Sequence, residues 1–293
     1  MIDSHYHLDE SIVSLENLIE DMDRADISKT ALIPAICPEL KDLPALVQPF
    51  LPLFRRLLHG PPGLLHKMVS KVYSGAVKKD GTVDLMGTSY ELFPEPDNDV
   101  VIEAVKKYPD RFVGYCFVNP ATQNNTAEIA EKYLAEPGIV GIKAHPFWHD
   151  YPIESLKDVA AICEEKARPL LVHMGVGDRG DFAYLHKNFP RLKVIYAHLG
   201  IPYSHAVCEE AKHNDNVYVD MSNTEYSDGA NLKMCVDKIG PEKILFGSDG
   251  PYMIAENGKF DYNPILDIVK TANLTDKQID KIGNENFDSI VNS

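Results

Sequence analysis

Short apolar, β-branched runs alternate along the chain with segments of helical periodicity. Eight runs have the composition of strands: Met1–Ser4, Thr30–Ala35, Phe112–Val118, Val140–Ala144, Pro169–His173, Lys193–His198, Val217–Met221 and Lys243–Gly247. From the third run onward their starts lie roughly 24 to 30 residues apart, about the length of one strand plus one helix. Between the runs, apolar stripes such as Leu15, Leu18 and Met22 predict amphipathic helices.

Eight strands alternating with helices fit either a closed barrel or an open, doubly wound sheet. An open sheet usually carries a glycine-rich phosphate loop after its first strand, and this chain has His5-Tyr6-His7 there instead. Polar residues end one strand after another, as in a barrel whose site lies at the carboxyl ends of its strands. The sequence therefore predicts an α/β protein, a single (β/α)8 TIM barrel domain over residues 1–293.

The interval between the second and third strands is far longer than one helix needs. We treat residues 37–98 as an insertion, and loops of this length usually serve a function. Positive charge is concentrated in it at Arg55, Arg56, Lys67, Lys71, Lys78 and Lys79. Two interpretations remain open: a lid or oligomer contact that helps to attract an anionic substrate, or a helical excursion that packs over the barrel with a solvated basic face.

Composition excludes several classes of function. The formal net charge of -15 argues against a nucleic-acid partner, because phosphate-binding proteins usually carry a basic face. The five cysteines are odd in number and lack a C-x-x-C pair, which excludes a disulfide framework and a cysteine zinc site. The N-terminus has no signal-peptide pattern and no apolar stretch is long enough to span a membrane, so we expect a cytoplasmic protein without a membrane partner.

Histidines and an aspartate stand at the ends of the predicted strands. His5 and His7 are two residues apart on one strand, so both side chains point to the same face. Three later strands end in His173, His198 and Asp249. Imidazoles combined with a carboxylate suit a divalent transition metal that activates a bound water.

The sequence also suggests roles for the acidic residues near these histidines. Asp249 is placed to take the proton of the water and pass it to the leaving group. Spare imidazole N–H groups need acceptors, for which Asp3 and Asp220 are candidates, although either could be a structural cap. The histidines of the insertion and the helices are expected at the surface: His59, His66, His186, His205 and His213.

Five motifs resemble those of the amidohydrolase superfamily: I-D-S-H-Y-H, G-I-K-A-H-P, L-V-H-M, Y-A-H-L-G and F-G-S-D-G-P. They look most like the amidohydrolase-2 branch, which includes the aminocarboxymuconate-semialdehyde decarboxylase-like enzymes. The closing segment I-G-N-E-N-F is similar too, with Glu285 in place of the usual small residue. The resemblance covers nearly the whole chain except the insertion.

The resemblance implies that one metal is bound by four residues, His5, His7, His173 and Asp249. Zinc is expected, with manganese, iron or cobalt as alternatives. His198 would be a catalytic base, or a further ligand if a second metal is present. Lys143 would orient substrate; in binuclear relatives a carboxylated lysine at this position bridges two metals, but the surrounding motifs favour the mononuclear branch.

Several residues beyond the strand ends are candidates for substrate binding: Lys143, His145, Trp148, Arg179 and Asn223. Loops above a barrel rim commonly determine specificity. Arg179 could pair with a substrate carboxylate, or with Asp178 or Asp181 in a surface network. The expected partner is a small, anionic molecule, and a homodimer is possible.

The expected reaction is hydrolysis of a C–N or C–O bond in a small carboxylated substrate. The alternative is a nonoxidative decarboxylase of an unsaturated or aromatic acid, which would use the same residues. TatD-type nucleases share the D-x-H-x-H-L-D opening but place a glutamate where this chain has Lys143 and His145. A non-catalytic barrel would be expected to have lost some of the ligands.

Overall fold

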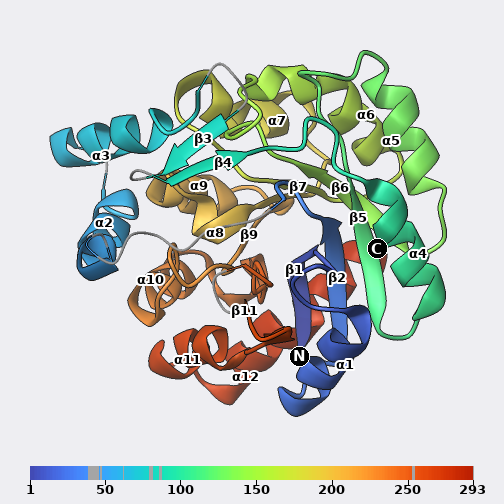
Figure 1. Cartoon of the computed structure of the whole chain (residues 1–293). Coiled ribbons are helices and arrows are strands. Elements are labelled where there is room, and N and C mark those ends of the chain that lie inside the picture. Colours follow the sequence, from blue (N-terminus) through green and yellow to red (C-terminus); the bar gives the residue numbers. More distant parts are fainter. Residues whose placement is uncertain are drawn as a thin grey trace.

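Eight parallel strands form one sheet that closes into a barrel (Figure 1). The computed structural model describes residues 1–38, 46, 48–61, 63–78, 82–85, 88–252 and 255–292. In sheet order the strands are β1 (Ile2–Leu8), β2 (Lys29–Pro34), β5 (Phe112–Phe117), β6 (Ile139–Ala144), β7 (Leu170–Val172), β8 (Val194–Tyr196), β9 (Val217–Asp220) and β10 (Ile244–Leu245). The eight predicted strands are confirmed, and β1 extends far enough to contain both His5 and His7.

The first and last strands meet, which closes the barrel. The Ser4 amide donates to the Phe246 carbonyl at 2.9 Å, and the His7 amide donates to the Gly250 carbonyl at 2.7 Å. Every strand neighbours the next barrel strand along the chain. The carboxyl ends of all eight strands therefore form one rim, where the predicted polar residues collect.

Helices surround the sheet, most of them on its outside. They are α1 (Leu15–Arg24), α4 (Asn98–Lys107), α5 (Thr126–Leu134), α6 (Lys157–Glu165), α7 (Phe182–Asn188), α8 (Ala197–Gly200), α9 (Ser204–Ala211), α10 (Gly229–Ile239), α11 (Asn263–Thr271), α12 (Asp276–Asp280) and α13 (Asn286–Asn292). In α1 the predicted stripe is buried at Leu15, Leu18 and Met22, and the Ser14 side chain caps its first turn.

Two apolar layers hold the barrel together. The larger lies between the sheet and the helices, and the smaller fills the barrel interior with side chains such as Ile33, Leu171 and Leu245. From α13, Phe287 and Ile290 pack against this inner layer together with Ile2, at the amino end of β1. The five cysteines are buried and free, in agreement with the sequence. Among the described residues no helix is long and apolar enough to cross a membrane.

The described part of the insertion contains a short 3-10 helix at Gln48–Phe50, two α-helices and a hairpin. The α-helices, α2 (Leu51–Leu58) and α3 (Leu64–Ser74), lie at the left of Figure 1, and the hairpin consists of the antiparallel strands β3 (Thr82–Leu85) and β4 (Thr88–Glu91). Leu58, Tyr73 and Val83 from the insertion share one apolar cluster with Phe117 and Phe147 from the barrel. The inner side of the insertion therefore packs over the carboxyl rim.

Candidate metal centre

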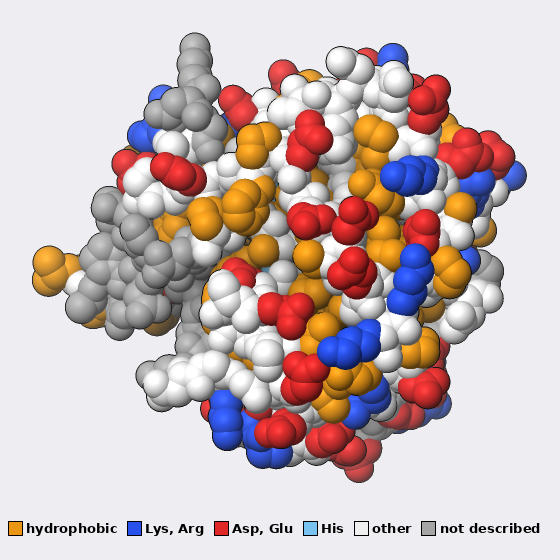
Figure 2. Space-filling view, turned by 45° about the vertical axis from the view of Figure 1, so that its right-hand side comes forward, with side chains coloured by type: hydrophobic (Ala, Val, Ile, Leu, Met, Phe, Trp, Pro, Cys, Tyr) orange, Lys and Arg blue, Asp and Glu red, His pale blue; other side chains and the backbone are white. Residues whose placement is uncertain are grey.

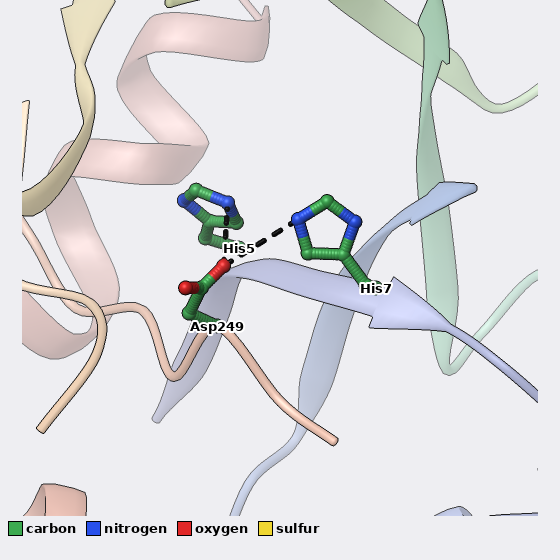
Figure 3. A group of neighbouring side chains, drawn as sticks. All are labelled: His5, His7 and Asp249. Atoms are coloured by element: carbon green, nitrogen blue, oxygen red, sulfur yellow. Dashed lines mark ion pairs between the residues drawn. The ribbon is translucent and has the colours of Figure 1, made fainter. Parts of the chain in front are cut away.

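Three side chains converge at the centre of the rim (Figure 3). The Nε2 atoms of His5 and His7 lie 3.1 and 3.4 Å from the same carboxylate oxygen of Asp249. The potential ligand atoms of these three residues all lie within 4.8 Å of one another. Each residue offers one lone pair to a common point, which is the arrangement that a metal ion requires.

The outward nitrogen of each ring is fixed by an acceptor. His5 donates from Nδ1 to Asp220 Oδ2 at 2.9 Å, and His7 donates from Nδ1 to the Pro34 carbonyl at 3.0 Å. These bonds place the proton on Nδ1 and leave the Nε2 lone pair directed inward. Asp220 therefore contacts an imidazole, as one of the two interpretations of the sequence predicts.

His173 and His198 stand beside this group. The Nδ1 atom of His173 lies 3.1 Å from Nε2 of His198, which in turn lies 4.0 Å from Asp249 Oδ2. His198 Nδ1 lies 3.2 Å from the Ser222 carbonyl, and His173 Nε2 lies 3.0 Å from the Tyr73 hydroxyl. In all four histidines one nitrogen is thus turned outward and the other faces the centre.

This donor set fits a divalent cation. Burial holds the pKa of His173 well below its ordinary value and lowers that of His198 to about 4, so both rings are neutral. Two neutral imidazole nitrogens 3.1 Å apart need a proton or a cation between them. Imidazole nitrogens with one carboxylate are suitable ligands for zinc, manganese, iron or cobalt.

Asp249 is held as a carboxylate. Burial alone would raise its pKa, but the facing imidazoles of His5 and His198 hold the pKa well below the ordinary range. Asn223 donates from Nδ2 to its second oxygen at 2.8 Å. The side chain is 14% exposed, whereas the His5 side chain is fully buried, so Asp249 is the more accessible of the two.

Three residues of the site adopt left-handed backbone conformations. The φ angles are 55° at His198, 69° at Asn223 and 61° at Asp249. A residue with a Cβ atom pays about 1–2 kcal/mol in this region. Each stands just after a barrel strand, where the unusual φ turns its side chain toward the centre, and strain of this kind is concentrated at functional sites.

Lys143, on β6, lies at the floor of the site. Its side chain is fully buried, and Nζ lies 3.3 Å from His5 Nε2. Burial lowers its pKa to about 8, opposed by Asp249 and Asp220. Of the other residues predicted on this side, His145 packs against His173 with ring centroids 4.2 Å apart and accepts a hydrogen bond from the Trp148 amide at 3.1 Å.

Arg179 lies further out and joins three segments. It reaches Asp150 at 3.1 Å and donates to the Phe147 carbonyl and to the Ser74 hydroxyl on α3. Its carboxylate partner is therefore Asp150, and neither Asp178 nor Asp181. The structure places it between the rim and the insertion, whereas Lys143, His145 and Asn223 lie at the metal ligands.

One open alternative is decided and two expectations are corrected. Asp3 accepts hydrogen bonds from the amides of His5 and Ser248 and from the Ser248 hydroxyl, so of its two interpretations the structure favours the structural cap. His59 and His186 are buried, although both were expected at the surface. His59 lies under α2, where it contacts the Ser204 hydroxyl and the Tyr226 carbonyl, a long-range docking contact with no signal in the sequence.

Two residues of the site were not predicted at all. Ser222 lies next to both rings, with Oγ 3.2 Å from His5 Nδ1 and 2.9 Å from His198 Nδ1. Its position two residues after Asp220 at the end of a strand is a signal that could have found it. Tyr73 comes from α3 of the insertion, and no spacing in the sequence connects it with the barrel.

A pocket of about 400 Å³ opens beside the ends of β1 and β2. Leu8, Ala35 and Phe93 form its apolar wall. Four carboxylates also line it: Asp9, Glu10, Glu95 and Asp97. This charge repels an anion, so the pocket does not suit a carboxylated substrate. On the face shown in Figure 2, acidic side chains are scattered among apolar and basic ones.

Comparison with known families agrees with this geometry. The family model described as Amidohydrolase matches residues 88–286, which include the barrel from β5 onward together with His173, His198 and Asp249. The chain belongs to the amidohydrolase family. Amidohydrolases of this kind are metal-dependent enzymes, so the predicted recognition and the predicted enzymatic character are confirmed. No curated protein matches the chain.

Solved structures with the same fold cover nearly the whole amidohydrolase chain. The 5-carboxyvanillate decarboxylase from Sphingomonas paucimobilis has a TM-score of 0.60 at 12% identity, covering 100% of this chain and 98% of its own. A dihydroxybenzoic acid decarboxylase from Polaromonas, with bound manganese, has a TM-score of 0.57 at 15% identity, with 99% and 96% covered. A probable 2-pyrone-4,6-dicarboxylic acid hydrolase from Acinetobacter baumannii has a TM-score of 0.59 at 14% identity, with 100% and 99% covered. These similarities show the fold and not the reaction.

Proposed function

We propose that this amidohydrolase is a hydrolase that uses one divalent metal to cleave a C–N or C–O bond in a small carboxylated substrate. The metal would be held by His5, His7 and Asp249, whose ligand atoms converge, and by His173, which stands beside them next to His198. When bound, it would lower the pKa of a water and polarise a carbonyl oxygen. Zinc is the first choice, and manganese is to be tested beside it because a structural neighbour binds it.

The observation that carries this proposal is the carboxylate of Asp249. It is ionised, lies among His5, His7 and His198, and is steadied by Asn223. A carboxylate in this position accepts the proton of an attacking water and returns it to the leaving group. His198 Nε2 faces the centre beside Asp249 and is a second group that can accept a proton there. Lys143 contributes positive charge at the floor of the site, where negative charge develops.

Decarboxylation of an unsaturated or aromatic acid is the second candidate, and the aromatic surroundings of the site favour it. His173 lies beside Phe147 and Tyr226, and His7 lies beside Tyr252, with centroids between 5.6 and 6.1 Å apart. Such rings suit a planar substrate. Two structural neighbours are decarboxylases of aromatic acids. In this reaction a proton is added to carbon as CO2 leaves.

One experiment separates the two reactions. The metal-loaded protein is incubated with a panel of lactones, amides and aromatic acids in water enriched in oxygen-18 or in deuterium oxide, with Asp249→Asn as the inactive control. A hydrolase yields a product that carries oxygen-18 in its new carboxyl or hydroxyl group. A decarboxylase releases CO2 and yields a product with deuterium on carbon. Protein that binds no metal by elemental analysis would contradict both.

A further inference from the structure

Tyr73 connects the insertion with the metal centre. It stands near the end of α3, its side chain is buried, and its hydroxyl lies 3.0 Å from His173 Nε2. The ring stacks on Phe147, with centroids 4.2 Å apart and an angle of 24° between the planes. The hydroxyl is thus held in place by packing on the barrel and not by α3 alone.

The contact falls on the outward nitrogen of His173. The opposite nitrogen, Nδ1, faces His198, which is itself the neighbour of Asp249. His5 and His7 show the same division, with the outward nitrogen on an acceptor and the inward one toward the centre. The acceptors in those two cases are a carboxylate and a carbonyl of the barrel. For His173, within the part of the chain that the structure describes, the outward nitrogen instead contacts Tyr73 of the insertion.

The direction of this hydrogen bond follows from the other side of the ring. His173 Nδ1 lies 3.1 Å from His198 Nε2 and faces the centre, where a metal ligand must offer a lone pair. A neutral imidazole carries one proton, which is then on Nε2 and is donated to the Tyr73 oxygen at 3.0 Å. The Tyr73 side chain is also hydrogen bonded to Tyr226, which can accept the Tyr73 hydroxyl proton.

We propose that Tyr73 is a positioning residue, through which α3 of the insertion fixes the Nε2–H tautomer of His173 and so leaves the Nδ1 lone pair free for the metal. The proposal rests on the proposed metal-dependent function. It makes the insertion part of the metal centre, because the barrel alone supplies three oriented histidines and α3 orients the fourth. Removing such an acceptor typically weakens metal binding by about 10- to 100-fold.

The test compares Tyr73→Phe with Ser74→Ala in the full chain. Phenylalanine keeps the stacking on Phe147 and removes only the hydroxyl. Ser74→Ala removes a neighbouring contact of α3, with Arg179, and leaves His173 untouched. Zinc affinity is measured by competition with a chromophoric chelator, and the protonation of the two His173 nitrogens by nitrogen-15 NMR of the metal-free protein. Thermal unfolding checks that both variants remain folded.

We expect Tyr73→Phe to lose at least tenfold in zinc affinity and to change the His173 nitrogen signals, while Ser74→Ala changes affinity by less than about threefold. Wild-type affinity within twofold in Tyr73→Phe, together with unchanged nitrogen signals, would overturn the proposal. If the wild-type protein binds no metal, the proposed function fails. The nitrogen signals of the metal-free protein still decide whether Tyr73 orients His173.

Discussion

At the scale of single residues, the site depends on which nitrogen of each imidazole carries the proton. Asp220 illustrates the point, because its carboxylate contacts the His5 ring and also two backbone amides of the site. Its Oδ2 accepts from His5, and its Oδ1 accepts from the amides of His198 and Ser222 at 3.1 and 3.0 Å. Burial opposes ionisation of Asp220, but His5 and His198 nevertheless hold its pKa below the ordinary value.

We therefore expect Asp220→Asn to weaken metal binding by about 10- to 100-fold, since the amide can turn a donor toward His5 and disturb its tautomer. The control is Asp215→Asn, the same change at a fully exposed carboxylate. Metal affinity is measured by chelator competition. Equal affinities in the two variants would mean that His5 is oriented without Asp220.

Whether a residue of this site could be predicted depends on how far along the chain its contact partners lie. The sequence predicts His5 and His7 from strand alternation, and His173, His198 and Asp249 from their places at strand ends. Asn223 is a candidate from the loop after a strand, and Asp220 a candidate acceptor for an imidazole N–H group. Tyr73 and His59 could not be predicted, because their partners lie on strands and loops a hundred or more residues away. Pairing of that kind depends on how the insertion docks, which no local pattern specifies.

At the scale of elements, the insertion is a pair of helices held to the rim by polar contacts. Arg55 donates to the carbonyls of Thr224 and Glu225, and His66 Nε2 lies 2.6 Å from the Pro202 carbonyl. Few apolar side chains of α2 and α3 are buried, so these contacts carry much of the docking. An element of this kind can open without unfolding of the barrel.

Metal binding should protect α3 from hydrogen exchange. If docking of α3 orients His173 and raises metal affinity, linkage requires that the metal favours docking by the same factor. We expect slower exchange of the α3 amides in the zinc-loaded protein, with α1 as an internal reference. In Tyr73→Phe the effect of zinc on α3 should disappear. Zinc-independent exchange of α3 in the wild type would refute the coupling.

Lowering the pH should weaken the docking of α2 on the barrel, because the His59 side chain is buried in its neutral form. Burial lowers its pKa from 6.5 to about 4, with Asp228 opposing and Arg55 and His205 adding to the shift. Between these values the undocked state binds a proton that the docked state does not, so docking weakens as pH falls from about 6.5 toward 4. Over this whole pH range the free energy of docking changes by about 3 kcal/mol at most.

We expect exchange of the α2 amides, corrected for intrinsic rates, to rise at least tenfold between pH 7 and pH 5. His59→Gln should remove most of this pH dependence, since glutamine does not titrate. His213→Gln changes an exposed histidine and serves as the control. An undiminished pH dependence in His59→Gln would assign the effect to another group, such as His205.

At the scale of the whole molecule, charge and apolar surface are unevenly distributed. The chain carries a net charge of -15, yet no acidic residue occurs between Asp42 and Asp80. The same segment exposes large apolar side chains on α2 and α3: Leu53, Leu64, Leu65, Met68 and Val72. The barrel could be predicted from the sequence because its strands repeat. For the insertion the sequence suggests an oligomer contact as one alternative, but not which side chains are exposed, since the apolar periodicity of α3 alone suggests burial.

A second copy of this chain is the partner that fits the exposed face. Leu64, Met68 and Val72 form a stripe four residues apart along the outer side of α3, and Lys67 and Lys71 flank it. Apolar side chains gain free energy by leaving water, and the flanking cations are complementary to the acidic remainder of a second molecule. We therefore expect a homodimer in solution, as the sequence suggests.

The double variant Leu64→Asp/Met68→Asp should shift the mass measured by light scattering to that of the monomer. Its metal affinity should stay within about twofold of the wild type, because neither side chain touches the metal centre. A wild-type mass of 32.7 kDa would show instead that the face is free in solution.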